Sequence, residues 1–319
     1  MATQLIPLRE VERLSSNVIR ILGGNPGKVI NILSRSSIAD QRVVHAPRRC
    51  GADIVLGSNT YLVGTGKQRL LIDTGEGKPS WIKLLDETLQ KENAIVTEVI
   101  ITHWHRDHQG GIEHLQQFSP DVIIYKNQPD YLASSDGWLD IKEGQRFSVD
   151  GASLRAVHSP GHAKDHMALV LEEENAMFTG DNVLGHGTAV FEDLAAYIKS
   201  LEKMKDAFQG RAYPGHGPVI EDGPSKILEY IRHRKQREDQ VIQVLKSSKS
   251  SPGAAAQAGE PDEWTSMEIV KIVYKDVPEN LHLAANGGVL QVLRKLEGEG
   301  KVVEDSEGEK WIIRDRAAL

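Results

Sequence analysis

The sequence predicts a layered α/β domain with two sheets packed face to face, followed by a smaller domain of helices and a hairpin. In the first two-thirds of the 319 residues, short strand-like segments come first and then alternate with helices. A run rich in Ser, Ala, Gly and Pro, SSKSSPGAAAQAGE at 247–260, then interrupts the pattern. Two more helices and a hairpin follow it. This length allows one large core and a small appended domain.

The predicted strands of the first part are short, rich in β-branched residues and bounded by Gly, Pro, Asp or Asn. The predicted helices show apolar residues at helical spacing, as in Leu194, Tyr197, Leu201 and Met204. The strands are expected at 18–22, 59–63, 69–72, 96–101, 122–125, 153–158, 167–171 and 176–179, and the helices at 81–91, 110–118, 190–208 and 224–246.

The end of the chain resembles a winged helix, with helices at 264–274 and 289–299 and a hairpin in KVVEDSEGEKWII. Winged helices commonly bind DNA, but this hairpin has an acidic edge that would repel phosphate. We therefore expect a packing or substrate-covering domain. The acidic residues are Glu304, Asp305, Glu307 and Glu309, and the predicted parts are a domain at 1–246, a linker at 247–262 and a winged-helix-like domain at 263–319.

Composition excludes several classes of protein. The net charge of −7 argues against broad contact with a nucleic-acid backbone. The apolar runs are too short to span a membrane, and the start, MATQLIPLREVERL, lacks the pattern of a signal peptide. A single cysteine, Cys50, excludes a disulfide within the chain and suits a reducing compartment. We expect a cytoplasmic protein with no membrane contact.

One stretch, THWHRDHQGG at 102–111, places three histidines and an aspartate just after the apolar strand that ends at Ile101. Ligand sites of layered α/β folds lie beyond the carboxyl ends of strands. His103 and His105 are two residues apart, so both can point the same way in an extended backbone. Burying three unpaired imidazoles is costly, and clusters of His and Asp are typical of metal sites.

Three later stretches offer further metal ligands, each a single ligand-type residue beside a glycine turn. SPGHAKDHM contains His162, MFTGDNVLG contains Asp181, and AYPGHGP contains His216. In each, an apolar strand ends, the backbone turns at glycine, and the ligand-type residue follows. Packing alone does not explain this repetition, so we expect these residues to join the first cluster.

HWHRDH matches the HxHxDH signature of the metallo-β-lactamase superfamily, and His162, Asp181 and His216 match its later ligands in order. LLIDTGEG, VFEDL, YPGHGPVI and IVYKDVPENLH also resemble a subgroup that contains β-lactamase-like protein 2 and fungal lactamase-like hydrolases, including acyl-carrier thioesterases of aromatic polyketide biosynthesis. The resemblance covers nearly the whole chain. It implies an αββα sandwich with a C-terminal winged-helix-like domain.

The resemblance also implies two zinc ions. Three imidazoles leave a tetrahedral zinc ion one open position for water, and two dications would lower the pKa of that water enough to give hydroxide at neutral pH. Asp107 would also be catalytic, since it can orient the nucleophile and handle its proton. The implied ligands are His103, His105 and His162 for the first ion, Asp107, His108 and His216 for the second, and Asp181 bridging both.

Other candidates are open to two interpretations. Asp73, in IDTGEG, either orients metal ligands or serves as a turn residue. His166 either supports the site or lies on the surface, and His186 is expected to be a loop residue. RHRKQRED at 232–239 is expected to be a solvated helix face. The remaining histidines discussed are expected to be structural: His114, His158, His233 and His282.

The stretch 28–55 has no counterpart in the resembling proteins and interrupts an expected hairpin. One interpretation is a substrate-recognition loop. Our hypothesis is a translated intron or gene-model error, because the segment lacks a clear period and differs from its flanks. Sequencing the transcript tests this, since a spliced message that encodes all of 28–55 would exclude it.

Three functions follow from these features. The first is hydrolysis of an acyl thioester, either a small one or one carried by the acyl carrier domain of a polyketide synthase. A thiolate leaves without a strong general acid because its pKa is about 8.5. The second is a single-stranded endoribonuclease, disfavoured by the acidic charge and by the 5% aromatic content. The third, a non-catalytic binding module, is disfavoured by the complete ligand set.

Overall fold

The computed structural model describes residues 7–24, 57–128, 137–249 and 262–314. The unusual stretch at 28–55, Cys50 and most of the expected linker lie outside these ranges. The chain forms two compact units that divide at Arg232, inside helix α5 (Gly223–Lys246). Each unit is described by itself, and the limits expected for the domains remain a prediction.

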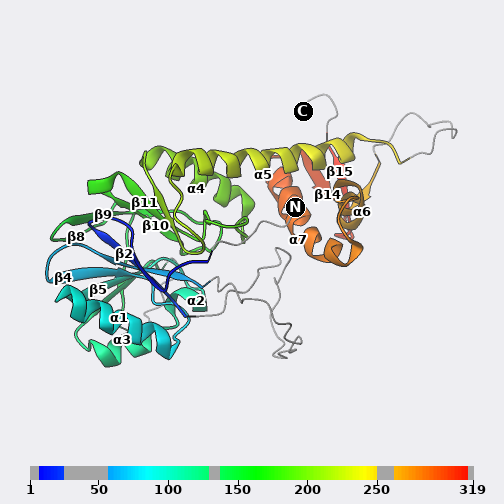
Figure 1. Cartoon of the computed structure of the whole chain (residues 1–319). Helices are drawn as coiled ribbons and strands as arrows, with labels where there is room; N and C mark the ends of the chain where they lie inside the picture. The colour runs from blue at the N-terminus through cyan, green and yellow to red at the C-terminus, as the bar shows by residue number, and fades with distance from the viewer. Residues whose placement is uncertain (1–6, 25–56, 129–136, 250–261, 315–319) are drawn as a thin grey trace. The chain divides into compact units, whose positions relative to one another are not determined.

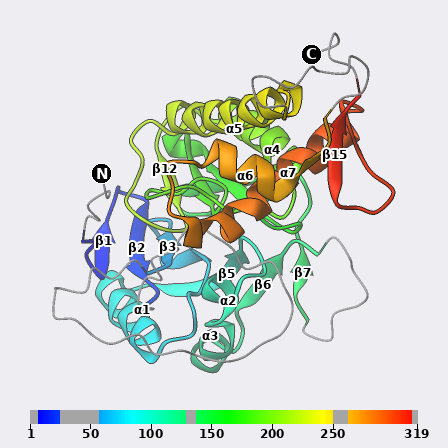
Figure 2. The same cartoon turned by 90° about the vertical axis from the view of Figure 1, so that its right-hand side faces the viewer.

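The first unit contains two sheets packed face to face (Figure 1). Figure 2 shows the strands of the seven-stranded sheet side by side from β1 to β7. Its strands β1 to β4 are antiparallel and β4 to β7 are parallel. They span β1 Val11–Arg13, β2 Val18–Leu22, β3 Asn59–Val63, β4 Gln68–Ile72, β5 Ile95–Ile101, β6 Ile123–Lys126 and β7 Leu139–Asp140.

The second sheet has five strands in the order β12-β11-β10-β9-β8. All neighbours are antiparallel except β11 and β12, which are parallel. The strands are β8 Arg146–Val149, β9 Ala152–His158, β10 Met167–Leu171, β11 Ala176–Gly180 and β12 Ala212–Pro214, with a 3₁₀ turn η1 at Glu172–Glu174.

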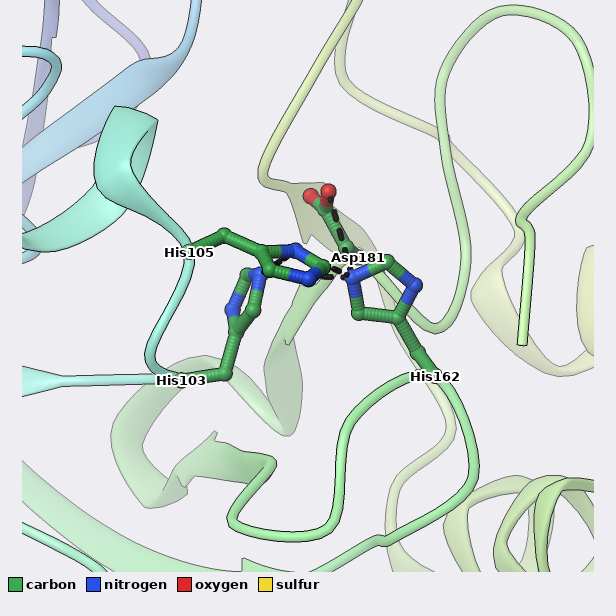
Figure 3. A group of neighbouring side chains, drawn as sticks. All are labelled: His103, His105, His162 and Asp181. Atoms are coloured by element: carbon green, nitrogen blue, oxygen red, sulfur yellow. Dashed lines mark hydrogen bonds and ion pairs between the residues drawn. The ribbon is translucent and has the colours of Figure 1, made fainter. Parts of the chain in front are cut away.

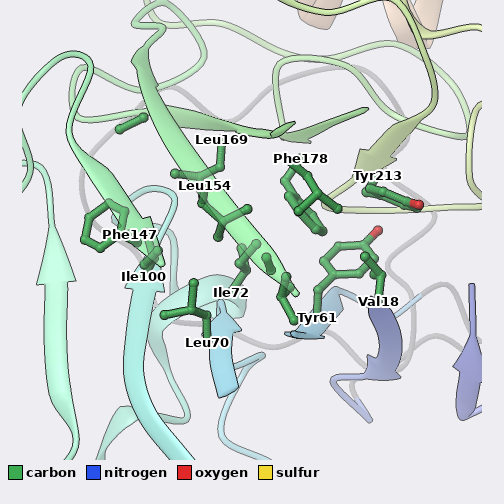
Figure 4. Close-up of a cluster of buried hydrophobic side chains, with 14 of the residues drawn as sticks. Val18, Tyr61, Leu70, Ile72, Ile100, Phe147, Leu154, Leu169, Phe178 and Tyr213 are labelled. Carbon is green, nitrogen blue, oxygen red and sulfur yellow. The ribbon is translucent and has the colours of Figure 1, made fainter. Parts of the chain in front are cut away.

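Alternation along the strands creates two separate cores. Leu70 and Ile72 of β4 face the second sheet, whereas Leu71 between them faces the helices. Figure 4 shows the core between the sheets, where Tyr61 packs against Phe178 and Tyr213. Helices α1 and α3 cover the outer face of the first sheet and α4 covers that of the second (Figure 1). The helices are α1 Pro79–Glu92, α2 Arg106–Gln109, α3 Ile112–Phe118 and α4 Leu194–Ala207.

Among the described residues, the second unit contains the part of α5 from Arg232 onward, helices α6 and α7, and a three-stranded sheet in the order β13-β15-β14. A capping box closes the N-terminus of α6. The Thr265 side chain accepts a hydrogen bond from the backbone N–H of Glu268, and the Glu268 carboxylate accepts one from the backbone N–H of Thr265. The acidic hairpin is partly neutralised within this unit, because Glu304 pairs with Arg294. The elements are β13 Trp264–Thr265, α6 Ser266–Val273, η2 Glu279–Leu281, α7 His282–Gly298, β14 Val302–Glu304 and β15 Lys310–Ile313.

The eight expected strands are all present, and so is each expected helix, with four corrections. The helix expected at 110–118 is α3, which begins at Ile112 after the Gly110-Gly111 pair, and the short helix α2 that precedes this pair was not expected. The helix expected from residue 264 begins at Ser266, because Trp264 and Thr265 form strand β13. The helix expected from residue 190 begins at Leu194, where the Asp193 side chain accepts the N–H of Ala196. The helix expected from 289 begins at His282. In the described ranges, no helix is both long enough and apolar enough to span a membrane.

Candidate metal centre

The carboxyl ends of strands from both sheets supply the residues of the candidate site. His103 follows β5 and Asp73 follows β4 in the first sheet. Asp181 follows β11 in the second sheet, and His216 comes two residues after β12. Parallel neighbours bring these ends to one edge of each sheet, which is where the sequence predicts the site.

His103, His105 and His162 form a first group, here called the histidine cluster. Figure 3 shows their rings converging, with Asp181 beside them. The Nε2 of His103 lies 2.9 Å from Nδ1 of His105, and the Nε2 of His162 lies 3.3 Å and 3.0 Å from those two atoms. Ligands about 2.0–2.1 Å from a tetrahedral zinc ion lie about 3.3 Å apart, so these three nitrogens are close to the spacing that such an ion requires.

Asp107, His108 and His216 form a second group, here called the aspartate cluster. The Nε2 of His216 lies 3.2 Å from Oδ2 of Asp107 and 3.4 Å from Nε2 of His108. His108 is fully buried, whereas Asp107 is 35% exposed. The aspartate cluster therefore has a partly exposed carboxylate that a water molecule can reach.

Asp181 lies between the two clusters. Its Oδ2 is 3.3 Å from Nε2 of His216 and 3.7 Å from Nε2 of His162, and its Oδ1 is 3.4 Å from Nε2 of His108. Within the described ranges, that Oδ1 is buried with no hydrogen-bond partner. A buried carboxylate with one unsatisfied oxygen near His108 and the other oxygen near an imidazole of each cluster fits a divalent cation.

The two clusters differ in charge. Burial lowers the pKa values of His103 and His105, and lowers the pKa of His162 to about 4, so these imidazoles are neutral donors. Burial opposes protonation of His108 and His216 as well, but the carboxylates around them raise both pKa values, that of His216 to about 9.

Burial alone would raise the pKa values of Asp107 and Asp181, yet the neighbouring histidines hold both below their usual range. Both side chains are carboxylates at neutral pH. Three neutral imidazoles and two carboxylates are ready to bind a divalent cation, whereas His108 and His216 must first lose their protons.

Asp73 both forms a turn and supports the site. Its φ of 59° is the left-handed conformation of a turn residue. Its Oδ1 accepts the backbone N–H of Thr102 at 2.8 Å, and its Oδ2 lies 2.8 Å from Nδ1 of His108. This contact leaves Nε2 of His108 to face the aspartate cluster.

His166 is not a surface residue. It is fully buried, its Nε2 accepts the backbone N–H of Asp181 at 3.1 Å, and its Nδ1 lies 2.9 Å from Oγ of Ser159. Since Nε2 accepts this hydrogen bond and burial keeps the ring neutral, Nδ1 carries the ring proton and donates it to Oγ of Ser159 in a hydrogen bond. His166 therefore positions the backbone of Asp181.

The other histidines of the described ranges belong to neither cluster. His186 is a half-buried loop residue, and burial lowers its pKa. His158 contacts the carbonyl of Lys164, and His282 contacts the carbonyls of Tyr274 and Val277. These contacts agree with the structural roles expected for the latter two.

Two polar residues at the start of β3 hold in place the turn that carries His216. Asn59 donates its side-chain amide to the carbonyls of Pro214 and Gly217, both at 2.8 Å. Ser58 forms a β-bridge with His216 and donates to Oδ2 of Asp107 at 3.2 Å. No motif marks Ser58 or Asn59, because their partners lie more than 40 residues away.

Known proteins resemble the chain along most of its length. The family model of the metallo-beta-lactamase superfamily matches residues 53–216, and that of the beta-lactamase associated winged helix domain matches residues 265–311. The lactamase-like protein adaB of Aspergillus niger is 42% identical over 302 residues, which cover 94% of this chain and 86% of that protein. The atrochrysone carboxyl ACP thioesterase of Aspergillus chevalieri is 42% identical over 316 residues, covering 98% and 91%.

A solved structure extends the likeness to the fold. The beta-lactamase domain protein from Burkholderia ambifaria aligns with a TM-score of 0.72 over 98% of this chain and 96% of its own, at 16% identity. By its sequence relatives and its family models, the chain belongs to the metallo-β-lactamase superfamily and carries that superfamily's associated winged-helix domain.

Proposed function

We propose that this protein is a metal-dependent hydrolase that cleaves an acyl thioester, releasing a polyketide chain from the acyl carrier domain of a synthase. The observation that carries the proposal is the placement of Asp181 between the histidine cluster and the aspartate cluster. The thioesterase name of a relative that is 42% identical supports the choice of bond and of partner.

We further propose that the histidine cluster holds one zinc ion, the aspartate cluster holds a second, and Asp181 bridges them. Bound there, the two ions would supply an activated water near neutral pH and a Lewis acid for the thioester carbonyl. The neutral imidazoles suit the first position, and the carboxylate of Asp107 suits the second.

Asp107 is the residue that we assign to the nucleophilic water. Its carboxylate stays ionised at neutral pH, it is partly exposed, and its Oδ2 already accepts hydrogen bonds from Ser58 and His216. A fixed acceptor of this kind can orient a water and take its proton. The thiolate needs no proton to leave, because its pKa is about 8.5.

The test gives one zinc-loaded preparation three substrates: an acyl-carrier thioester, a small acyl thioester and labelled single-stranded RNA. We expect hydrolysis of the thioesters, faster on the carrier, and none of the RNA. Asp107→Ala should lower kcat by about 100-fold or more, since it removes both the acceptor and a metal ligand. His158→Ala, which changes a histidine outside both clusters, is the matched control.

Two results would contradict the proposal. One is that the wild type cleaves RNA but neither thioester, and that Asp107→Ala abolishes the RNA cleavage. The other is thioester cleavage that persists after metal removal and in the Asp107→Ala variant. Zinc content measured on each preparation separates loss of metal from loss of the acceptor.

A further inference from the structure

Trp104 is an exposed aromatic residue in an unusual place. Its side chain is 50% exposed, whereas Trp81, Trp264 and Trp311 are buried. An indole left in water forgoes about 1.5–3 kcal/mol of burial, so an exposed one beside a catalytic site suggests a ligand that covers it.

The position of Trp104 follows from the alternation of the HWH segment. His103 on one side is fully buried, and His105 on the other turns its Nδ1 toward the histidine cluster. The Trp104 side chain, between them, is directed to solvent. Its ring still contacts the ring of His105, with centroids 4.6 Å apart and planes at 67°. The indole therefore lies next to a proposed metal ligand, yet is not part of the donor set.

A second exposed apolar residue touches the same cluster. The carbonyl of Val190 accepts the Nδ1–H of His162 at 2.8 Å, while the residue itself is 44% exposed. The next residue, Phe191, stacks on Tyr197 of α4, with ring centroids 5.4 Å apart, which restrains this part of the loop. The histidine cluster thus has two exposed apolar residues beside it, Trp104 at His105 and Val190 at His162.

We propose that Trp104, assisted by Val190, binds the acyl chain of the substrate and is a specificity-determining residue for chains with a flat aromatic ring. This inference rests on the proposed thioesterase function. An indole face stacks on a planar acyl group, and this contact adds to the burial of apolar area, so we expect a preference of roughly tenfold, which is about 1.4 kcal/mol. A two-carbon acyl chain is too short to gain this contact.

The experiment compares two thioesters that share the leaving group N-acetylcysteamine and differ only in the acyl part, acetyl or 2-naphthoyl. We expect Trp104→Ala to lower the ratio of kcat/KM values, naphthoyl over acetyl, by about tenfold, mainly through KM. Trp104→Phe should retain most of the ratio, and Val190→Ala should lower it about twofold. Phe118→Ala, which removes an exposed aromatic residue of α3, is the control and should leave the ratio unchanged.

A binding measurement keeps this inference separate from the proposed reaction. Calorimetric titration with 2-naphthoate, the product acid, should give a Kd about tenfold weaker for Trp104→Ala than for the wild type and the Phe118→Ala control. If the wild type hydrolyses neither thioester but shows this difference in binding, the proposed function fails and the aromatic subsite stands. Equal naphthoate binding by wild type and Trp104→Ala, or no binding by the wild type, would overturn the subsite.

Discussion

His166 is the buried imidazole that accepts the backbone N–H of Asp181, so it controls a carboxylate whose oxygens it does not contact. His166→Ala leaves that N–H unpaired, and we expect the free energy of unfolding to fall by about 1–3 kcal/mol. Zinc affinity should fall by roughly 10- to 100-fold, as for other residues that hold metal ligands in place. Denaturant unfolding and competition with a chelating dye measure the two effects.

A matched set of variants separates positioning by His166 from simple loss of packing. In His166→Gln the side-chain carbonyl can still accept the N–H of Asp181, so part of the zinc affinity should return. His158→Ala changes a partly exposed histidine of β9 and should alter neither quantity. Zinc affinity of His166→Ala equal to that of the wild type would show that Asp181 needs no such support.

The different charges of the two clusters predict different pH dependence for their ions. In the metal-free protein His216, with a pKa of about 9, is protonated at pH 7, whereas His162, with a pKa of about 4, is not. An ion at the aspartate cluster must displace protons, so its affinity should fall as pH falls, about tenfold per pH unit for each proton released. The ion at the histidine cluster displaces none above about pH 6.

Calorimetry between pH 6 and 8, in buffers of different ionisation enthalpy, counts the protons released with each ion. We expect proton release only with the ion that depends on His216, and in His216→Ala that ion should be lost while the other remains. Equal proton release for both ions would contradict the assignment of charge to the two clusters.

The seven residues that the sequence predicts as metal ligands stand at recognisable places, in the HxHxDH stretch after β5 or beside a glycine turn, and the structure brings them together. The residues that support them have no such mark in the sequence. The roles of Ser58, Asn59 and Thr102 depend on contacts made across the two sheets, and Ser, Asn and Thr are ordinary residues near strand ends. His166 was ambiguous for the same reason, since only its burial separates a support from a surface histidine.

The turn after β12 brings His216 into the site, and its glycine is required by the neighbours of the turn. A Cβ atom on Gly215 would lie 2.3 Å from Oδ1 of Asp181 and 2.9 Å from Cε1 of His108. Gly215→Ala should therefore push the turn away from Asp181 and weaken the ion at the aspartate cluster more than the ion at the histidine cluster. We expect a loss of stability of about 1–3 kcal/mol from the overpacking.

Gly287→Ala is the control for the turn, because a Cβ atom there meets no atom within 4 Å and the residue is inside helix α7. That change should leave zinc binding unaltered and should stabilise the protein by up to about 1 kcal/mol through helix propensity. Zinc titration and thermal unfolding of both variants make the comparison. Unchanged zinc binding by Gly215→Ala would mean that the turn has room to adjust.

Every strand of five or more residues was predicted, whereas the four-residue strand β8 was missed. The strands β7, β12 and β13 have only two or three residues each, too few for an alternation to appear. The expected start of helix α7 was seven residues too late. Two adjacent glycines, Gly287 and Gly288, lower the local helix propensity and so hid the first two turns of the helix. Burial of His282, Ala285 and Val289 along one side of the helix outweighs that cost.

At the scale of the whole molecule, the sequence predicts two domains by a change in composition at 247–260. The compact units of the structure divide at Arg232, where α5 is a continuous helix, and the domain limits expected from the sequence remain a prediction. Such a division depends on contacts between residues in the folded chain, and the polarity of the helix sequence does not reveal those contacts. The stretch 232–239, expected to be a solvated face, includes Glu238, which is buried and pairs with Lys295 inside the second unit.

All seven donor residues belong to the first unit, so removal of metal should affect the two units unequally. A ligand that binds only the folded state stabilises it by RT ln(1 + [L]/Kd), about 4.1 kcal/mol when its concentration is 1,000 times Kd. Without that ligand, the five imidazoles and two carboxylates of the two clusters face one another at about 3–4 Å. Chelation should therefore loosen the ends of β5, β11 and β12.

Hydrogen exchange of the full chain, with and without a chelator, measures this at each segment. We expect faster exchange in peptides that cover Ile101 to His108 and Gly180 to Asn182 in the chelated protein, because their amides are held by the site. Peptides that cover β14 and β15 should exchange at the same rate in both samples. Re-addition of zinc should restore slow exchange, which controls for irreversible unfolding. Equal acceleration in both units would show instead that the metal centre stabilises the chain as one cooperative body.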